Sequence, residues 1–324
     1  MDVLITGGAG YIGSHVVKLL GETGDFNITT VDNLSTGKRS AILFGEFIEA
    51  DLSDFSLIEK IIQERRFDAI IHFAASIVVP ESVENPLKYY LNNTVNTINL
   101  INLCNKYGIK DFIFSSTAAV YGNPREIPVR ENEPLCPISP YGTSKMMIEQ
   151  VLIDSAMANL NFQYAILRYF NVAGADVKGR IGQSFDNATH LIKVAAQTVL
   201  GAREKIDIFG DDYDTPDGTG IRDYIHVDDL AMAHLIALEY LQSNDSDIFN
   251  CGYGHGFSVK EVIETMKEVS KIDFRVDLAP RRAGDAAILI SDNSKIVEKL
   301  KFKPQYDDIE LICKTALEWE RKCI

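Results

Sequence analysis

A glycine-rich turn between a short apolar run and a helical segment constrains the fold more than any other feature of this sequence. Residues Thr6 to Gly13 follow the apolar run Val3 to Ile5 and open a segment with helical periodicity. Gly7 allows a tight turn, Gly10 lets the backbone approach a pyrophosphate, and Gly13 permits close packing of helix on sheet. The turn therefore predicts a Rossmann-type unit that binds a dinucleotide. The residues expected to contact that cofactor here are Gly7, Gly10, Tyr11, Ile12 and Gly13.

Short apolar runs alternate with segments of helical periodicity along the first half of the chain. This is the pattern of βαβ units around a parallel sheet. The predicted strands are Val3–Thr6, Ile28–Val31, Ala69–Phe73, Asp111–Ser115 and Tyr164–Arg168. The predicted helices are Tyr11–Leu20, Ser56–Arg65, Leu87–Tyr107 and Tyr141–Asn159. The expected fold class is α/β, a doubly wound parallel sheet of Rossmann type.

The composition of the sequence changes after residue 170, where longer polar loops rich in Gly, Asp and Asn begin. This half holds two helical segments, Lys260–Ser270 and Ile309–Lys322, and predicts a smaller α/β substrate lobe. The strand and helix pattern of Tyr224–Leu241 is expected to return to the first lobe. We therefore predict a cofactor domain of residues 1–170 plus about 223–250, and a substrate lobe of about 171–222 plus 251–324.

The charge balance limits the partners of the chain. It carries 46 acidic and 32 basic residues, a formal net charge of -14. Affinity for nucleic acid or for an anionic membrane surface needs clustered Lys and Arg, so neither partner is expected. No stretch approaches the roughly 20 apolar residues that span a bilayer. An anionic ligand must therefore be held by a few local cations and backbone amides.

The cysteines and histidines indicate neither a disulfide set nor a metal site. The five cysteines form no C-x-x-C pair and are odd in number, which fits a reducing cytosol. The six histidines show no spacing typical of metal ligands, and the cysteines do not complement them. We expect a cytoplasmic protein without a metal.

Asp32, at the end of the second predicted strand, indicates which dinucleotide is bound. It stands 19 residues beyond Gly13, where a carboxylate would accept hydrogen bonds from the adenosine ribose hydroxyls and repel a 2′-phosphate. This favours NAD over NADP, although Lys38 and Arg39 lie nearby, and a simple turn residue is the alternative interpretation of Asp32. Further contacts are expected from the loops after the second, third and fourth strands: Asn33, Asp51, Leu52, Phe73, Ala74 and Ala75.

Tyr141 and Lys145 indicate the chemistry. On a helix, residues four apart share one face. An ammonium beside the phenol favours the phenolate and lowers the pKa of the tyrosine from about 10 towards the working pH. Transfer of a hydride from an alcohol carbon to a nicotinamide requires such a base, because the hydroxyl proton must leave as well. The alternative is a tyrosine packed at a helix start, with Lys145 on a solvated face.

Six motifs occur in order along the chain: Gly7–Gly13, Phe114–Thr117, Val120–Gly122, Tyr141 with Lys145, Arg168–Asn171 and Gly220–His226. Together they resemble those of extended short-chain dehydrogenases/reductases and, more narrowly, of the UDP-hexose 4-epimerases. The resemblance covers about residues 1 to 320. It implies NAD-dependent epimerisation at carbon 4 of a UDP-hexose through a transient 4-keto sugar. It also implies a homodimer built on the helices that contain Leu87–Tyr107 and Tyr141–Asn159.

The same resemblance assigns residues to the site. It implies Tyr141 as the catalytic base, Thr117 as a relay for the proton, and Lys145 as the group that activates the tyrosine. Further cofactor contacts are expected at Asn92, Ser115, Tyr169 and Phe170. The UDP is expected at Asn171, His190, Leu191, Arg222, Arg282 and Asp285. His190 replaces a familiar asparagine and Ile77 a frequent lysine, which puts one nucleotide contact and the tightness of NAD binding in doubt.

Leu289 bears on the choice of sugar. It falls where many epimerases restricted to hexoses have a tyrosine that borders the sugar pocket. A smaller residue leaves volume for a 2-acetamido group. By resemblance to bifunctional bacterial epimerases, we expect the chain to accept UDP-N-acetylglucosamine and UDP-N-acetylgalactosamine as well as UDP-glucose and UDP-galactose.

Two other functions compete with epimerisation. Dehydratases and decarboxylases of this fold carry acidic residues just after the position of Thr117, because eliminating water needs an additional acid and base. Ala118 and Ala119 stand there instead, and a reductase would consume cofactor stoichiometrically. A cofactor-sensing regulator would be expected to lose Thr117, Tyr141 or Lys145, and all three are present. An epimerase needs no more than these groups.

Overall fold

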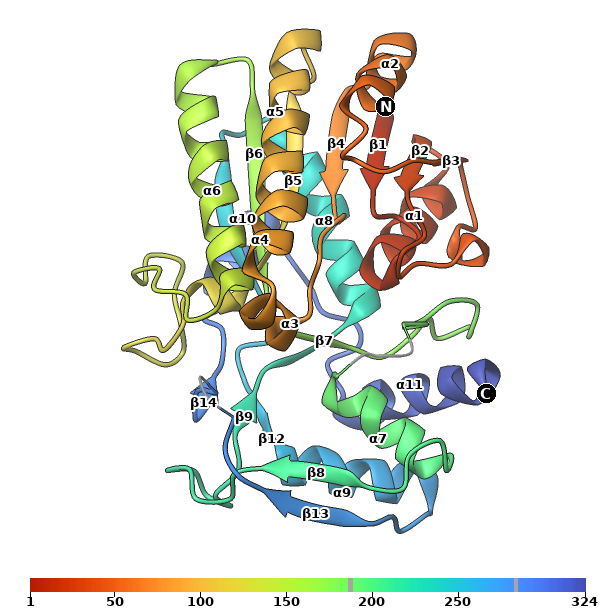
Figure 1. Ribbon diagram of the computed structural model, residues 1–324, viewed down its shortest axis with the longest axis vertical. Coiled ribbons are helices and arrows are strands. Elements are labelled where there is room, and N and C mark those ends of the chain that lie inside the picture. Colours follow the sequence, from red (N-terminus) through yellow and green to blue (C-terminus); the bar gives the residue numbers. More distant parts are fainter. Residues whose placement is uncertain (186–188, 283–284) are drawn as a thin grey trace.

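A computed structural model describes residues 1–185, 189–282 and 285–324 (Figure 1). Seven strands of the described chain form one parallel sheet in the order β11-β6-β5-β4-β1-β2-β3. They are β1 (Asp2–Thr6), β2 (Asn27–Asp32), β3 (Glu46–Glu49), β4 (Ala69–His72), β5 (Asp111–Thr117), β6 (Gln163–Tyr169) and β11 (Asp247–Cys251). The chain builds one half of the sheet from β1 outwards to β3 and the other from β4 outwards to β6. The reversal between β1 and β4 leaves a crevice at the carboxyl ends of the strands.

Helices cover both faces of this sheet, because its strands are apolar on both sides. In β1, Val3 and Ile5 belong to one hydrophobic core and Leu4 to another, as alternation along a strand requires. The helices of the first face are α1 (Tyr11–Thr23) and α8 (Val227–Leu241), and those of the second are α2 (Phe55–Arg65), α5 (Asn96–Tyr107) and α6 (Pro140–Ala158). The predicted doubly wound α/β class is confirmed.

Shorter elements gather below the carboxyl edge of the sheet (Figure 1). Their strands are β7 (Asn171–Ala173) with β10 (Tyr224–His226), β9 (Ile221–Arg222) with β12 (Phe257–Ser258) and β14 (Ile288–Leu289), and β8 (Ile206–Phe209) with β13 (Val276–Ala279). Their helices are α7 (Leu191–Val199), α9 (Val259–Ser270) and α11 (Ile309–Cys323), while α10 (Ser294–Leu300) packs against β11.

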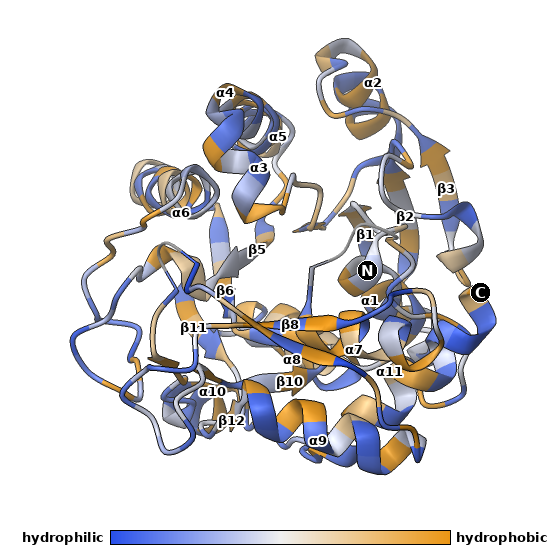
Figure 2. Ribbon diagram, turned by 60° about the horizontal axis from the view of Figure 1, so that its bottom comes forward, coloured by the Kyte–Doolittle hydropathy of each residue, from blue (hydrophilic) through white to orange (hydrophobic). Residues whose placement is uncertain are grey.

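One hydrophobic core joins these shorter elements to the sheet. Helix α9 has hydrophobic and hydrophilic faces (Figure 2) and buries Val262, Ile263 and Met266. It packs against α7 and α11, and the buried residues of all three belong to the same cluster as Val16 of α1 and Leu230 of α8. The first face of the sheet is therefore continuous with the smaller lobe.

The segment Leu87–Tyr107, predicted as one helix, is divided in the structure. Helix α4 (Pro86–Tyr89) leads into a π-helical segment, Tyr90–Val95, before α5 begins. Asn93 in this segment donates hydrogen bonds to the Ser76 carbonyl (3.0 Å) and to Ser144 Oγ (3.1 Å). A π-turn adds a residue without ending the helix, so the hydrophobic period does not reveal it. The short helix α3 (Val79–Glu84) and the 3-10 turns Arg39–Ala41 and Ala118–Val120 were not predicted.

The described residues contain no membrane-spanning helix, no disulfide and no cluster of metal ligands. None of their helices has the length and apolar character needed to cross a membrane. No disulfide joins the five cysteines within these ranges. The same residues contain no group of three or more His, Cys, Asp or Glu side chains that could hold a metal ion, and the absence of a metal stays a prediction.

Candidate active site

The glycine turn lies at the switch point, against the loop that follows β4. Gly7 has a positive φ of 75°, and a Cβ there would lie 2.5 Å from the Ala74 nitrogen. A Cβ on Gly13 would lie 2.4 Å from the Gly7 carbonyl oxygen. Both positions therefore require glycine. The N-cap of α1 is Gly10, which has no side chain to cover the first N–H groups of the helix. N–H groups at this end of a helix are the ones that bind phosphate.

Asp32 links the glycine turn to the loop after β2. Its Oδ2 accepts a hydrogen bond from the Ala9 N–H (3.0 Å), and its Oδ1 accepts one from the Leu34 N–H (2.8 Å). Burial raises the pKa of this carboxyl, and the two N–H groups oppose the shift. Asn33 donates to Asp51 Oδ2 at 2.7 Å. Asp32 thus stabilises a turn, as the alternative interpretation stated. It also lies next to Asn33, which was predicted with it to contact the adenosine end of NAD.

The remaining residues predicted at this end occupy the walls of the crevice. Phe73 and Ala74 donate their N–H groups to the Thr6 carbonyl (2.8 and 3.1 Å), and Ala75 follows them. Leu52 belongs to the second core, and Ile12 packs against the first. Phe73 and Ala74 therefore lie against the glycine turn, and contact of all these residues with the cofactor stays a prediction.

Thr117, Tyr141 and Lys145 meet at the carboxyl end of β5. Tyr141 stands in the first turn of α6, whose N-cap Ser139 accepts a hydrogen bond from the Gly142 N–H (3.2 Å). The Tyr141 phenol is hydrogen-bonded to Thr117. Lys145 donates its Nζ to the Ser115 carbonyl at 2.8 Å, and only 2 % of the residue is exposed. The alternative of a solvated lysine is therefore wrong.

The pKa values of this pair move in opposite directions. Burial lowers the pKa of Lys145 to about 7, against a raising effect of the Glu149 carboxylate. Burial raises the pKa of Tyr141, and the hydrogen bond with Thr117 opposes that shift. The sequence predicted a tyrosine pKa below its ordinary value. In the structure the pKa of Tyr141 is raised instead, so the predicted direction is wrong. Burial of the phenol raises its pKa by more than the surrounding groups of the protein lower it.

The other residues predicted beside the nicotinamide border the same end of the sheet. The Tyr169 hydroxyl is hydrogen-bonded to Ser115 and to His234. Phe170 belongs to a small apolar cluster next to the catalytic strand. Asn92 lies on the π-helical segment.

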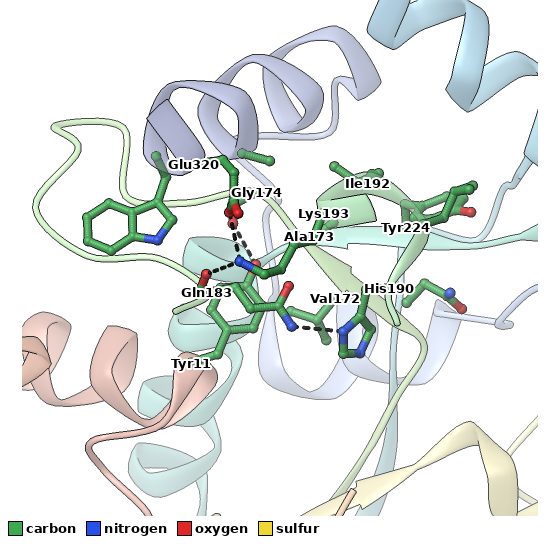
Figure 3. A pocket seen from close by; sticks show the side chains of 14 residues that line it. Tyr11, Val172, Ala173, Gly174, Gln183, His190, Ile192, Lys193, Tyr224 and Glu320 are labelled. Carbon is green, nitrogen blue, oxygen red and sulfur yellow. Dashed lines mark hydrogen bonds and ion pairs between the residues drawn. The ribbon is translucent and has the colours of Figure 1, made fainter. Parts of the chain in front are cut away.

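A pocket brings one predicted cofactor residue together with three predicted substrate residues (Figure 3). Tyr11 of α1 lines it with Asn171 of β7 and with His190 and Leu191 at the start of α7. The Tyr11 hydroxyl donates to the Gly174 carbonyl at 2.6 Å. The pocket therefore lies where the cofactor helix meets the smaller lobe.

Two other predicted substrate residues lie on the small sheet below. Arg222 of β9 and Leu289 of β14 are register partners. Leu289 packs against the apolar cluster that begins at Ala118, directly after Thr117. The Asn171 N–H donates to the Asp223 carbonyl at 2.9 Å, which ties this sheet to β7. Leu289 thus lies against the segment that follows β5, and its place beside the sugar stays a prediction.

Arg282 and Asp285 flank Ala283 and Gly284, which lie outside the described residues. The Arg282 guanidinium stands 3.6 Å from the centre of the Phe209 ring, a cation–π contact. The Asp285 N–H donates to the Arg282 carbonyl at 3.3 Å. Arg282 and Asp285 do not line the pocket that contains Tyr11.

Sequence reasoning missed a buried ion pair beneath the catalytic lysine. Arg168 Nη2 donates to Glu149 Oε2 at 2.6 Å, and Glu149 also accepts from Ser116. Glu149 follows Lys145 by one helical turn, so the spacing Tyr141, Lys145, Glu149 was a signal for a third residue on that face.

The comparisons with known proteins identify the family. A family model described as the NAD dependent epimerase/dehydratase family matches residues 3–252. The chain belongs to this family. It is 51% identical to the UDP-glucose 4-epimerase of Azospirillum brasilense, over 98% of this chain and 92% of that one. It is 47% identical to the UDP-glucose 4-epimerase of Streptococcus mutans, over 98% and 96%.

Solved structures give the same result. The UDP-Glc/GlcNAc 4-epimerase from Campylobacter jejuni is 58% identical, with a TM-score of 0.88 over 99% of both chains. The UDP-glucose 4-epimerase from Bifidobacterium longum, solved with NAD+ and UDP, is 36% identical, with a TM-score of 0.94 over 99% and 98%. The resemblance to UDP-hexose 4-epimerases is confirmed, and the NAD dependence of the family confirms the predicted cofactor.

Replacing Gly7 by Ala should weaken NAD binding. The new Cβ would collide with the Ala74 nitrogen, so the phosphate-binding turn must move. We expect NAD affinity to fall by at least about tenfold, measured by fluorescence titration with NADH. Gly24→Ala is the matched control, because Gly24 has a similar φ of 78° and nothing within 4 Å of its Cβ. Equal affinity in the two variants would contradict the assignment.

Proposed function

We propose that this protein interconverts UDP-glucose and UDP-galactose, and also UDP-N-acetylglucosamine and UDP-N-acetylgalactosamine, by epimerisation at carbon 4. The observation that carries the proposal is that Thr117 at the end of β5, Tyr141 in the first turn of α6 and the buried Lys145 meet at the crevice that also holds the glycine turn. The names of the relatives described above support the same reaction.

Tyr141 acts in this proposal as the base. Its phenolate accepts the proton of the sugar 4-hydroxyl, directly or through the Thr117 hydroxyl. NAD supplies, when bound, a reversible acceptor for the hydride of carbon 4. Lys145 in its protonated form favours the phenolate across one helical turn, and its link to the Ser115 carbonyl holds it there. The return of the proton from Tyr141 completes the cycle.

Inversion requires that the 4-keto sugar turn while its nucleotide stays bound. Arg222 and Arg282 are the cations that we assign to the diphosphate, since a planar guanidinium binds phosphate oxygens bidentately. Asn171, His190, Leu191 and Asp285 complete the proposed UDP site. The sugar, by contrast, is held loosely, so that either face of carbon 4 can be presented to the cofactor.

The side chains after Thr117 favour epimerisation over the other reactions of the family. Ala118 and Ala119 form a 3-10 turn there and offer neither an acid nor a base. Elimination of water or carbon dioxide would need an additional group of that kind.

The cofactor and sugar nucleotide are assigned to different parts of the chain. We assign residues 1–170 plus about 223–250 to NAD and about 171–222 plus 251–324 to the UDP-sugar. The position of β11 at the edge of the seven-stranded sheet supports this division. Cys104, Cys136, Cys251 and Cys313 form no disulfide in the described ranges, which supports a cytoplasmic location.

An exposed apolar face supports a homodimer. Val83, Leu87, Leu91 and Val95 follow one another at intervals of four residues along α3, α4 and the π-helical segment, and all four are exposed. Met147 of α6 is exposed as well, and α6 packs beside α5 (Figure 1) and contacts α3, α4 and the π-helical segment. A contiguous apolar surface of this kind fits a second copy of the same chain.

Replacing Leu87 and Leu91 together by Lys should give a monomer, because two charges would be buried at the contact. Analytical ultracentrifugation measures the mass of each species. Leu160→Lys is the control, since Leu160 is 89% exposed but lies beyond the end of α6. A wild-type protein that sediments as a monomer would contradict the proposed dimer.

Tyr141→Phe should abolish turnover and leave UDP binding within about threefold of wild type, because the substitution removes the base without changing the fold. Activity is followed by coupled assay and UDP binding by calorimetry. Tyr240→Phe is the control and should retain activity. Tyr240 lies near the end of α8, at the amino ends of β5 and β6, whereas Tyr141 lies at the carboxyl end of β5. Retained activity in Tyr141→Phe would mean that another group is the base.

Leu289→Tyr should narrow the substrate range. A larger side chain beside the Ala118 cluster would fill the space proposed for the acetamido group. We expect conversion of UDP-N-acetylglucosamine to fall by at least about tenfold and that of UDP-glucose to change little, as followed by proton NMR of the anomeric signals. Wild-type protein that converts UDP-glucose alone would refute the N-acetyl substrates and leave the mechanism standing.

A further inference from the structure

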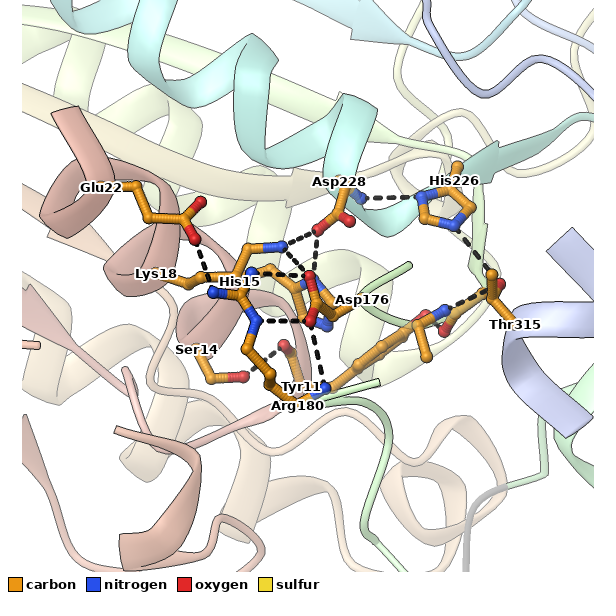
Figure 4. Close-up of polar contacts among 12 residues, drawn as sticks. Tyr11, Ser14, His15, Lys18, Glu22, Asp176, Arg180, His226, Asp228 and Thr315 are labelled. Carbon is orange, nitrogen blue, oxygen red and sulfur yellow. Dashed lines mark hydrogen bonds and ion pairs between the residues drawn. The ribbon is translucent and has the colours of Figure 1, made fainter. Parts of the chain in front are cut away.

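A buried lysine joins the cofactor helix to the smaller lobe (Figure 4). Lys18 of α1 is 5% exposed, and its Nζ lies 2.8 Å from Asp176 Oδ1 and 2.6 Å from Asp228 Oδ1. Asp228 stands in the first turn of α8, on the same side of the sheet as α1. Asp176 belongs to the loop that leaves β7. The ammonium therefore links α1 both to α8 and to the loop.

A second contact binds the same two parts. The Tyr11 hydroxyl donates to the Gly174 carbonyl at 2.6 Å. Tyr11 and Lys18 are seven residues apart, so they lie two turns apart on one face of α1. The loop from residue 174 is thus attached to α1 at two points, Tyr11 and Lys18. The first of them, Tyr11, lies beside the glycine turn where the pyrophosphate is expected.

Arg180 also ties the loop to α1 at the point where Lys18 contacts it. Arg180 donates to Asp176 through Nε (2.7 Å), Nη2 (3.0 Å) and its backbone N–H (3.1 Å), and it also reaches Glu22 of α1 at 2.5 Å. Burial alone would raise the pKa of Asp176, but hydrogen bonds from Arg180 and Lys18 hold it below its ordinary value. The carboxylate is therefore charged at neutral pH.

The described part of this loop, residues 174–185, touches the proposed nucleotide contacts on both sides. Asn171 precedes it on β7, and Gln183 Nε2 is hydrogen-bonded at 2.8 Å to His190 Nδ1, which stands beside Leu191 at the start of α7. Any shift of the loop relative to α1 would move those contacts relative to the cofactor. Hydride transfer is sensitive to such shifts, since a misplacement of about 1 Å can cost about a hundredfold in rate.

We propose that Lys18 is a positioning residue, which fixes the distance between the cofactor and the sugar nucleotide by holding Asp176 against α1. The inference rests on the proposed epimerase function and deepens it. Lys18 contacts neither ligand in this proposal. It keeps the cofactor-binding surface of α1 and the proposed UDP-binding surface of the smaller lobe at a fixed position relative to each other.

The test is Lys18→Met in the full-length protein. Both carboxylates keep a partner in this variant, because Asp176 retains Arg180 and Asp228 retains His15 at 2.6 Å. We expect kcat for UDP-glucose to fall by at least about tenfold, with KM and bound NAD changed by less than about threefold. Release of the 4-keto sugar, detected by mass spectrometry, should rise, and Lys18→Arg should recover part of kcat.

Lys295→Met is the matched control. Lys295 is ion-paired with Asp247, which also keeps Lys299 at 2.6 Å, and this pair joins α10 to β11 far from the pocket. Its kcat and ketose release should equal those of wild type. Equal values in Lys18→Met and Lys295→Met would overturn the proposal, as would a loss of kcat in proportion to the unfolded fraction.

If Lys18→Met does not fold, Asp176→Asn decides the question. It keeps the shape of the side chain and removes the charge that Lys18 holds. Lower kcat with increased ketose release would support the positioning role, and unchanged values would refute it. Wild-type protein that binds NAD and UDP but converts no UDP-sugar would overturn the proposed function itself, a result distinct from either.

Discussion

The contact between the glycine turn and the loop after β4 is the constraint on which the rest of the site depends. The Thr6 carbonyl accepts hydrogen bonds from both Phe73 and Ala74, and no Cβ fits between Gly7 and Ala74. Two strands that are distant in sequence are thereby brought to one crevice, with α1 pointing its first N–H groups towards it. Asp32 and Thr117 stand at the carboxyl ends of β2 and β5, the two strands that flank the central pair β1 and β4 in the same sheet order.

The parts of the fold that sequence could predict depend on local patterns. The strands buried on both faces appear as continuous apolar runs, and the glycine turn has a fixed spacing relative to β1 and α1. The π-helical segment Tyr90–Val95 could not be predicted, because its stabilising contacts come from Ser76 and Ser144 in other parts of the chain. The link between Tyr11 and Gly174 likewise joins residues far apart in sequence.

The site residues were predicted better than their electrostatics. Tyr141 and Lys145 share a helix face as their spacing required, but the spacing carried no information on how deeply each is buried. Desolvation depends on the whole fold, and it reverses the expected pKa direction of Tyr141. The ion pair of Arg168 with Glu149 has the same origin, since β6 and α6 meet only in the folded chain.

The hydrophobic core that runs without a break from α1 and α8 into α7, α9 and α11 has a consequence for motion. Opening the two lobes like a hinge would expose that apolar interior to water, and this opposes large displacements during each turnover. The turn that the proposed mechanism requires of the ketose would then be a rotation of the sugar ring itself. The frame that holds its nucleotide would stay in place while the ring turned.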